Sequence, residues 1–370
     1  MNKKILINVN SAWNIFNFRL GLIKHLQSEG YEIFALAPRD EYVRYLKSAG
    51  VKCFNILLNQ KGTNPITDFC LFVEYLRLFN KIKPNLILSY TIKPNIYGNF
   101  AASILKIPTI NNISGLGTLF IKTNFISSIG KILYKLSLRS SNHIFFQNNN
   151  DLELFIKSKL IKSHNCSVIP GSGVKTSVFK QNKKINKGEK FLFVGRLIGD
   201  KGVIEYLESA RQVLIEYPNV EFFLAGELGY NNKTALTKTQ LDNYTNSNSQ
   251  IKYLGKVDDM ISLLESIDVV VLPSYREGLS KSLIEAASMS LPIITSNVPG
   301  CIDVVKNEYN GLICQVKSIR SLEKNIKKMI KLSSEKRHEM GVNGRKIAIS
   351  KFDEKIIIQY YLKVIKKVLN

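Results

Sequence analysis

The sequence predicts an α/β protein built from two doubly wound parallel sheets. Short apolar runs alternate with stretches of helical periodicity, which is typical of parallel strands joined by helices. This alternation occurs twice, and a polar, lysine-rich stretch at 180–188 lies between the two series. The length of 370 residues exceeds what one ordinary core supports, and the hydrophobic content of 45% is enough for two cores.

The first half of the chain alternates regularly between the two patterns. Strands are expected at 4–9, 31–37, 86–91, 108–113, 143–147 and 167–170. Helices are expected near 17–29, 40–49, 68–82, 95–105 and 126–139. We therefore predict a first domain at 1–180, followed by a linker at 181–189.

The second half repeats the pattern. Strands are expected at 190–195, 219–225, 251–254, 268–272, 292–295 and 311–314, with helices between them. The segment 230–250, rich in Asn, Thr and Gln, is expected to be an exposed insertion. Apolar residues at helical spacing predict a last helix near 353–369. The second domain is therefore expected at 190–350, with a C-terminal segment at 351–370.

Two carboxylates lie eight positions apart where an apolar strand gives way to a helix. The strand 267–272 ends at Pro273, and the apolar helix face begins at Leu283. A helix N-terminus attracts phosphate through its free N–H groups. Glu277 precedes this helix, and Glu285 lies about two turns inside it, where a carboxylate can accept hydrogen bonds from sugar hydroxyls. Two glutamates alone would be ordinary helix-flanking charges, but this context favours a ligand site.

A second loop carries two cations between glycines. The apolar strand that begins at Phe191 runs into Gly195, Arg196, Lys201 and Gly202. An Arg can grip phosphate oxygens through its planar fork, and a Lys adds a point charge. Either cation alone would be a solvated residue at a strand end, but the glycines let a ligand approach the backbone closely. The loop therefore suits an anionic ligand such as a diphosphate.

Three stretches, FVGRLIGDKG, PSYREGLSKSLIEA and SNVPGCIDVV, resemble glycosyltransferase family 4. NVNSAWNIFNFRLGLIKHL, IKPNIYGN and SGLGTLF are similar to the amino-terminal half of a subgroup that builds bacterial surface glycans such as capsule and O-antigen, so the resemblance covers essentially the whole chain. It implies a retaining enzyme with the GT-B fold, in which two Rossmann-like domains face each other across a crevice. It also implies that the C-terminal helix packs back toward the first domain.

The resemblance implies a substrate pair. The subgroup it matches best transfers N-acetylgalactosamine to diacetylbacillosamine linked to undecaprenyl diphosphate. We therefore expect a UDP-sugar donor, a lipid-linked saccharide acceptor, and transfer of an N-acetylhexosamine. A UDP-sugar epimerase or phosphorylase of the same architecture remains an alternative, whereas a nicotinamide dehydrogenase is disfavoured because no G-x-G-x-x-G follows the first strand.

The resemblance also assigns donor-side roles by position. Arg196 and Lys201 would bind the donor diphosphate, Glu277 would meet the transferred sugar, and Glu285 would hold the ribose hydroxyls. The remaining residues implied for donor binding are Gly195, Gly278, Leu279 and Ser280. Two features depart from the family. Ser11-Ala12-Trp13-Asn14 stands where many members have paired glycines, and none of the four histidines is assigned as catalytic.

The acceptor-side candidates follow strands of the first half of the chain. Asn17 and Arg19 come after the first strand, Lys93 follows a later one, and Ser114 and Gly115 follow the next. Loops at the carboxyl ends of parallel strands border the ligand crevice in such sheets. Lys93 could contact an acceptor phosphate. The alternatives are that Lys93 is only solvated and that Gly115 only shapes a turn.

The charge is strongly positive and uneven. The net charge is +23, and residues 1–180 hold 23 Lys and Arg against 8 Asp and Glu. Such an excess attracts nucleic acid, an anionic membrane or a phosphorylated acceptor. A nucleic-acid partner is not expected, because no recognisable binding module or set of aromatic platforms among the cations is present. The amphipathic segment 125–139, with Lys131, Lys135 and Arg139, is a candidate interfacial helix; the alternative is a helix packed on the sheet.

Cofactor and compartment can also be predicted. The five cysteines form neither a C-x-x-C pair nor a metal cluster, which favours the cytosol. No run approaches the roughly 18 apolar residues of a spanning helix, so the chain is not expected to cross a membrane by itself. The polyisoprenoid acceptor that the resemblance implies favours peripheral association with the inner face of the plasma membrane. No metal or other cofactor is expected, because the two cations and the helix amides could stabilise the departing diphosphate.

Overall fold

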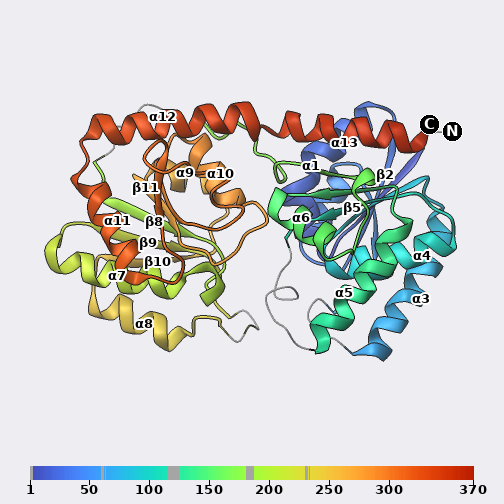
Figure 1. The fold of residues 1–370 in the computed structure, drawn as a ribbon, viewed down its shortest axis with the longest axis horizontal. Helices are drawn as coiled ribbons and strands as arrows, with labels where there is room; N and C mark the ends of the chain where they lie inside the picture. The colour runs from blue at the N-terminus through green and yellow to red at the C-terminus, as the bar shows by residue number, and fades with distance from the viewer. Residues whose placement is uncertain are drawn as a thin grey trace. The chain divides into compact units, whose positions relative to one another are not determined.

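The computed structural model describes residues 3–59, 62, 64–115, 125–180, 187–229, 232 and 234–370. The chain divides into two compact units, Met1–Ser172 with Lys355–Asn370, and Gly173–Glu354. Each unit contains one sheet with helices on both faces (Figure 1). Most of the linker expected at 181–189 lies outside the described residues.

The sheet of the first unit has the strand order β3-β2-β1-β4-β5-β6-β7, and the pairings within it are parallel. Its strands are β1 (Lys4–Asn8), β2 (Glu32–Ala37), β3 (Lys52–Asn55), β4 (Leu86–Tyr90), β5 (Thr109–Ile113), β6 (His143–Phe146) and β7 (Cys166–Val168). The chain order reverses between β1 and β4, and crevices at such switch points bind ligands in open α/β sheets.

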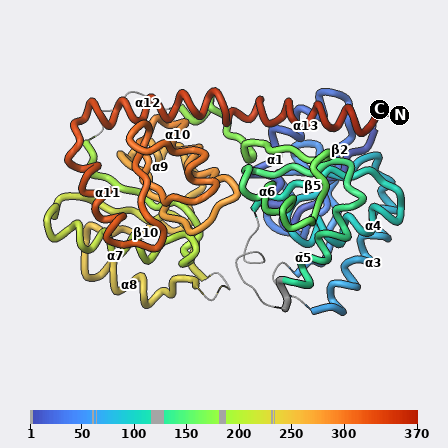
Figure 2. Tube along the Cα trace, in the orientation of Figure 1, coloured from blue at the N-terminus to red at the C-terminus, as the bar shows by residue number. Residues whose placement is uncertain are grey.

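Helices cover both faces of this sheet. They are α1 (Ala12–Ser28), α2 (Val43–Ser48), α3 (Pro65–Ile82), a π-helix (Pro94–Gly98), α4 (Asn99–Ile104), α5 (Phe125–Ser137), α6 (Asn149–Lys157) and α13 (Glu354–Leu369). Ile15 and Ile23 of α1 share one apolar core with Tyr361 of α13, whereas Tyr75 and Phe79 of α3 belong to a second core. The chain trace shows α13 beside α1, with both termini in this unit (Figure 2).

The sheet of the second unit has the order β10-β9-β8-β11-β12-β13, and its pairings are also parallel. Its strands are β8 (Lys190–Val194), β9 (Glu221–Ala225), β10 (Ile251–Gly255), β11 (Val269–Leu272), β12 (Ile293–Ser296) and β13 (Gly311–Cys314). Its helices are α7 (Val203–Glu216), α8 (Lys238–Ser247), α9 (Met260–Glu265), α10 (Lys281–Ser288), α11 (Ile319–Lys331) and α12 (Ser334–Lys351). Here the chain order reverses between β8 and β11.

The expected strands are confirmed, but three local predictions were incomplete or wrong. β3 was missed because it is a short edge strand of half-buried and exposed residues without an apolar run. Helix α1 begins at Ala12 rather than near 17, because the Ser11 side chain caps it by accepting from Asn14 N at 3.2 Å. The segment 230–250 is not simply an insertion, since it contains α8, whose start carries a capping box of Thr237 and Gln240.

Candidate active site

The two motif loops of the second unit lie side by side at its switch point. One loop follows β8 and the other follows β11, and these strands are neighbours in the sheet. The amide of Tyr275 donates to Asp200 O at 2.9 Å, which ties the loops together. Gly202 has a left-handed φ of 75°, and a Cβ there would lie 2.2 Å from Pro273 O. Only glycine therefore fits where the loops cross.

The contact brings Lys201 and Glu277 into an ion pair across 76 positions of sequence. The Lys201 and Glu277 side chains are 19% and 10% exposed. The Ser274 hydroxyl donates to the same Oε1 of Glu277 at 2.7 Å, and Ser274 is itself fully buried. A carboxylate held by two partners on one oxygen is oriented before any ligand arrives.

The N-terminus of α10 lies next to this pair. Ser280 is its N-cap residue, but its hydroxyl lies 3.1 Å from Ser282 Oγ and makes no capping hydrogen bond. The first amides of α10 lack intrahelical partners, as at any helix start. Gly278 and Leu279 lead directly into this turn, so their backbone is close to a site suited to an anion.

Glu285 lies further along α10. Its side chain is 12% exposed, and Lys281 Nζ lies 3.6 Å from its Oε1. Burial raises the pKa of the Glu285 carboxyl above its ordinary value, and the charge of Lys281 opposes that shift. A largely desolvated carboxylate at this depth is suited to accept hydrogen bonds from hydroxyl groups of a ligand.

Gly195 and Arg196 stand at the carboxyl end of β8. Arg196 is exposed, as a phosphate-binding side chain needs to be. The Gly195 carbonyl packs against Gly226 after β9, where a Cβ would lie 1.9 Å from that oxygen. A Cβ at Gly195 itself would meet neighbours no closer than 3.8 Å, so the protein alone does not require glycine there.

Two residues of the site were not assigned from the sequence. Ser274 lies inside the stretch PSYREGLSKSLIEA, but only the fold shows that its hydroxyl donates to the Glu277 carboxylate. Gly300 follows β12 with a left-handed φ of 79°, and a Cβ there would lie 2.7 Å from the carbonyls of Glu277 and Gly278. The P-G pair at 299–300 signals a turn but gives no hint of what the turn packs against.

The acceptor-side candidates lie in the first unit, and three of their side chains contact other residues of the protein. Arg19 is 5% exposed, with its guanidinium carbon 4.1 Å from the centre of the Tyr90 ring. Asn17 donates to Trp13 O at 3.0 Å. Lys93 is not simply solvated, because it forms an ion pair with Asp68 in which the two side chains are 12% and 10% exposed.

The end of β4 has unusual backbone geometry. Thr91, a β-branched residue, has a left-handed φ of 68°, and the π-helix Pro94–Gly98 follows. Strained residues and π-helical turns cluster at functional sites. Ser114 and Gly115 follow the neighbouring strand β5 and are half-buried. The strand ends near Lys93 and Ser114 are therefore adjacent, and their part in acceptor binding stays a prediction.

His143 lies on β6 and has a structural environment. Its Nε2 is 2.9 Å from Ser167 Oγ, and its ring packs on Phe145. Burial, helped by the charge of Lys367, lowers the pKa of His143 to about 4. The imidazole is therefore neutral near pH 7 and bonded within the sheet.

Comparison with known proteins identifies both halves of the chain. Residues 4–148 match the family described as glycosyl transferase 4-like, and residues 174–347 match glycosyl transferases group 1. The chain is 30% identical to the N,N'-diacetylbacillosaminyl-diphospho-undecaprenol alpha-1,3-N-acetylgalactosaminyltransferase of Campylobacter jejuni over 96% of both chains. It is 28% identical to the capsular polysaccharide biosynthesis glycosyltransferase CapM of Staphylococcus aureus, over 96% of this chain and 95% of that one.

Solved structures agree on the fold. Alr3699/HepE of Anabaena, crystallised with UDP and glucose, superimposes with a TM-score of 0.82 at 17% identity, over 99% of this chain and 100% of that one. The two doubly wound units, the two family matches and the full-length relative confirm the GT-B fold expected from the sequence. The chain belongs to the family 4 glycosyltransferases.

Proposed function

We propose that the protein transfers a sugar, an N-acetylhexosamine such as N-acetylgalactosamine, from a UDP-sugar to a saccharide carried on undecaprenyl diphosphate. The configuration of the transferred sugar is retained. The name of the Campylobacter jejuni relative supports this acceptor and sugar, and the Anabaena structure with UDP supports the donor nucleotide. The product belongs to a bacterial surface glycan or a protein glycan.

One observation carries the proposal: the cation Lys201, the carboxylate Glu277 and the N-terminus of α10 converge at the switch point of the second sheet. The cation and the amides suit the two phosphates of the donor. In this assignment Arg196 joins them, Glu277 binds the transferred sugar, and Glu285 binds the ribose hydroxyls. Gly195, Gly278, Leu279 and Ser280 line the donor through their backbone.

Charge stabilisation of the leaving UDP is assigned to Arg196, Lys201 and the α10 amides. Preorganised donors of this kind stabilise charge that develops on a leaving group. We therefore propose that transfer needs no metal ion. Turnover is expected to be unchanged after treatment with a chelator, and restoration of lost activity by Mg²⁺ or Mn²⁺ would contradict the proposal.

The acceptor is assigned to the first unit, to the side chains of Asn17, Arg19 and Lys93 and the backbone of Ser114 and Gly115. Their loops follow β1, β4 and β5 at the carboxyl edge of the sheet. Lys93 would have to exchange Asp68 for an acceptor phosphate, which the mobility of a Lys side chain permits. With this acceptor, the enzyme works at the cytoplasmic face of the plasma membrane, bound peripherally.

The proposal is tested by an acceptor-dependence assay. The purified protein is incubated with a panel of UDP-sugars and an undecaprenyl-diphosphate-linked amino sugar, while UDP release and product mass are followed. Acceptor-dependent addition of one hexosamine is expected. Arg196→Ala is expected to raise the donor KM about 10–100-fold, since it removes charge-assisted hydrogen bonds to phosphate.

Arg211→Ala is the matched control, because Arg211 is an exposed residue of the same unit whose guanidinium pairs with Glu208. It should leave the donor KM unchanged. Conversion of the UDP-sugar without acceptor would instead favour an epimerase. No reaction across the panel, from protein that remains folded, would overturn the proposed substrates.

The pH dependence of donor binding follows from Glu285. Because burial raises its pKa, the carboxyl becomes protonated at a higher pH than an ordinary Glu. As the pH falls through that pKa, the carboxylate loses its charge and accepts hydrogen bonds from the ribose hydroxyls more weakly, so the donor KM is expected to rise on the acid side. In the Glu285→Gln variant, the donor KM should be high across the pH range and should no longer rise on the acid side.

The stability effect of the same group has the opposite sign. Between the ordinary pKa of 4.5 and the raised pKa, the folded state binds more protons at Glu285 than the unfolded state. The free energy of unfolding contributed by Glu285 therefore increases as the pH falls through this window. Glu339→Gln, at an exposed residue of the same unit paired with Lys336, is the control and should leave the pH profile of the donor KM unchanged. A wild-type donor KM that is flat across the window would contradict the role of Glu285.

A further inference from the structure

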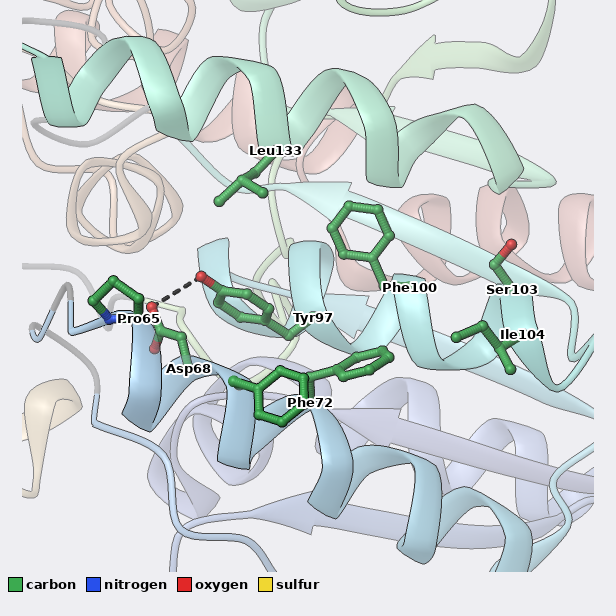
Figure 3. A pocket seen from close by; sticks show the side chains of 9 residues that line it. Pro65, Asp68, Phe72, Tyr97, Phe100, Ser103, Ile104 and Leu133 are labelled. Carbon is green, nitrogen blue, oxygen red and sulfur yellow. Dashed lines mark hydrogen bonds between the residues drawn. The ribbon is translucent and has the colours of Figure 1, made fainter.

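A pocket of about 490 Å³ opens in the first unit between α3, the π-helix with α4, and α5 (Figure 3). Its wall is mainly apolar and includes Phe69, Phe72, Phe100, Ile104 and Leu133. Figure 3 shows Leu133 reaching in from α5 on one side and Phe72 from α3 on the other. A concave apolar surface of this size is suited to a hydrocarbon ligand.

One end of the pocket is polar. Asp68 lies there and accepts a hydrogen bond from Tyr97 OH at 2.9 Å (Figure 3). The same carboxylate forms an ion pair with Lys93. Because the carboxylate has two partners in this structure, a polar ligand group is not needed to complete it as long as Lys93 remains paired with Asp68. The pocket therefore selects for an apolar chain rather than for a charged head group.

Exposed apolar side chains extend this surface along α3. Ile66, Phe69 and Val73 follow one another at helical spacing and are 75%, 64% and 47% exposed. Phe69 belongs both to this stripe and to the pocket wall. On α4, Ile104 is likewise a wall residue and is 62% exposed. Contiguous apolar surface of this kind marks an interaction site.

Helix α5 carries a second stripe on the other side of the pocket. Ile129, Ile132 and Leu136 are exposed, whereas Tyr134 of the same helix is buried in the core with Phe155. The alternative that α5 packs on the protein is thus correct for one face of the helix only. Its outer face remains apolar and open.

Cations flank the α5 stripe. Lys131, Lys135 and Arg139 recur at every fourth position, and residues 125–140 contain no Asp or Glu. Cations near an anionic lipid surface contribute about 1 kcal/mol each. A contact with a second copy is disfavoured, because a two-fold interface brings the same patch together and would oppose these like charges. No helix of the described chain is long and apolar enough to cross a membrane.

We propose that the face formed by α3, α4 and α5 docks on an anionic lipid bilayer, with one hydrocarbon chain of the membrane entering the pocket. The apolar stripes lie in the boundary between head groups and chains, and Lys131, Lys135 and Arg139 contact lipid phosphates. The inference rests on the proposed function only in that a membrane-embedded acceptor gives the docking a purpose. Vesicle binding can be measured without turnover.

The full-length protein is sedimented with vesicles of phosphatidylcholine, with and without phosphatidylglycerol. Binding is expected to need the anionic lipid. Phe69→Asp and Ile132→Asp should each lower the partition coefficient about tenfold or more, since each withdraws a large side chain from the lipid boundary. Ile215→Asp is the matched control, because Ile215 is 78% exposed on α7 of the other unit. Lys135→Glu should weaken binding, whereas Lys324→Glu on α11 should not.

The pocket is tested separately by fluorescence. The chain contains one tryptophan, Trp13, so Trp13→Phe with Leu133→Trp gives a single reporter in the pocket wall. Lipids brominated on their chains should quench the fluorescence of the tryptophan at position 133. The same lipids should quench Trp13 of the parent protein less. Absence of quenching in vesicle-bound protein would overturn chain entry.

The outcomes separate this inference from the proposed function. If the Asp variants bind vesicles like the control, or if the wild type does not bind, the docking face is wrong. If these variants lose self-association but still bind vesicles, the face is an interface between two copies of the chain, and the membrane-docking inference is overturned. Transfer to a water-soluble acceptor with a short isoprenoid should be unchanged in the Asp variants. If the wild type binds vesicles but transfers no sugar, the proposed function fails while the docking face stands.

Discussion

Lys201→Ala is expected to lower kcat/KM for sugar transfer about 10²–10³-fold, the usual loss when one preorganised donor to a developing negative charge is removed. In the structure, Lys201 is the cation that pairs with Glu277 at the switch point of the second sheet. The variant loses a phosphate ligand and leaves Glu277, only 10% exposed, without its counterion. A modest fall in melting temperature is therefore expected alongside the loss of activity.

Glu277→Gln and the double variant separate these two effects. If the ion pair stabilises the fold, the double variant should be less destabilised than the sum of the single variants, because neither partner is left uncompensated. Activity should stay low in all three. Lys252→Ala breaks a more exposed pair with Glu221 in the same unit and should retain activity. Near-normal transfer by Lys201→Ala would contradict its role at the donor diphosphate.

Gly300→Ala should abolish most activity without changing any functional side chain. The backbone at Gly300 has φ of 79°, which costs a residue with a Cβ about 1–2 kcal/mol. The new methyl would also lie 2.7 Å from the carbonyls of Glu277 and Gly278, so the loop that carries Glu277 must shift. Displacements of about 1 Å at a reacting centre can cost about 10²-fold in rate.

Gly30→Ala isolates the backbone cost, because Gly30 has a φ of 86° but a Cβ there would meet no atom within 4 Å. It should lower the melting temperature slightly and leave kcat/KM unchanged. Thermal unfolding and steady-state kinetics on both variants provide the measurement. A Gly300→Ala enzyme that loses stability like Gly30→Ala but keeps full activity would show that the loop position is not critical.

Much of the second unit is predictable from local sequence. Its central strands β11 and β12 are buried on both sides, so they appear as continuous apolar runs. Glycines and Pro273 then mark where the strands end and loops begin. Because loops after parallel strands share one edge of the sheet, the motif loops with Arg196 and Glu277 could be assigned to one site.

Local patterns failed where polarity masked a regular element. The β3 strand lies at the sheet edge and contains Lys52 and Asn55, so its apolar signal is weak. Helix α8 is polar throughout except for the buried Leu241, and its capping box was the better signal. Low average hydrophobicity therefore hid an element whose ends were well specified by hydrogen bonding.

By itself, the sequence determined the α/β class, the succession of strands and the residue types of the two motif loops, because these depend on near neighbours in the chain. Only the tertiary structure decided that Lys201 meets Glu277, that Gly300 packs against the backbone of Glu277 and Gly278, and which face of α5 stays exposed. Such contacts join segments far apart in sequence. They depend on strand order and helix packing, which the periodicity of a single segment does not specify.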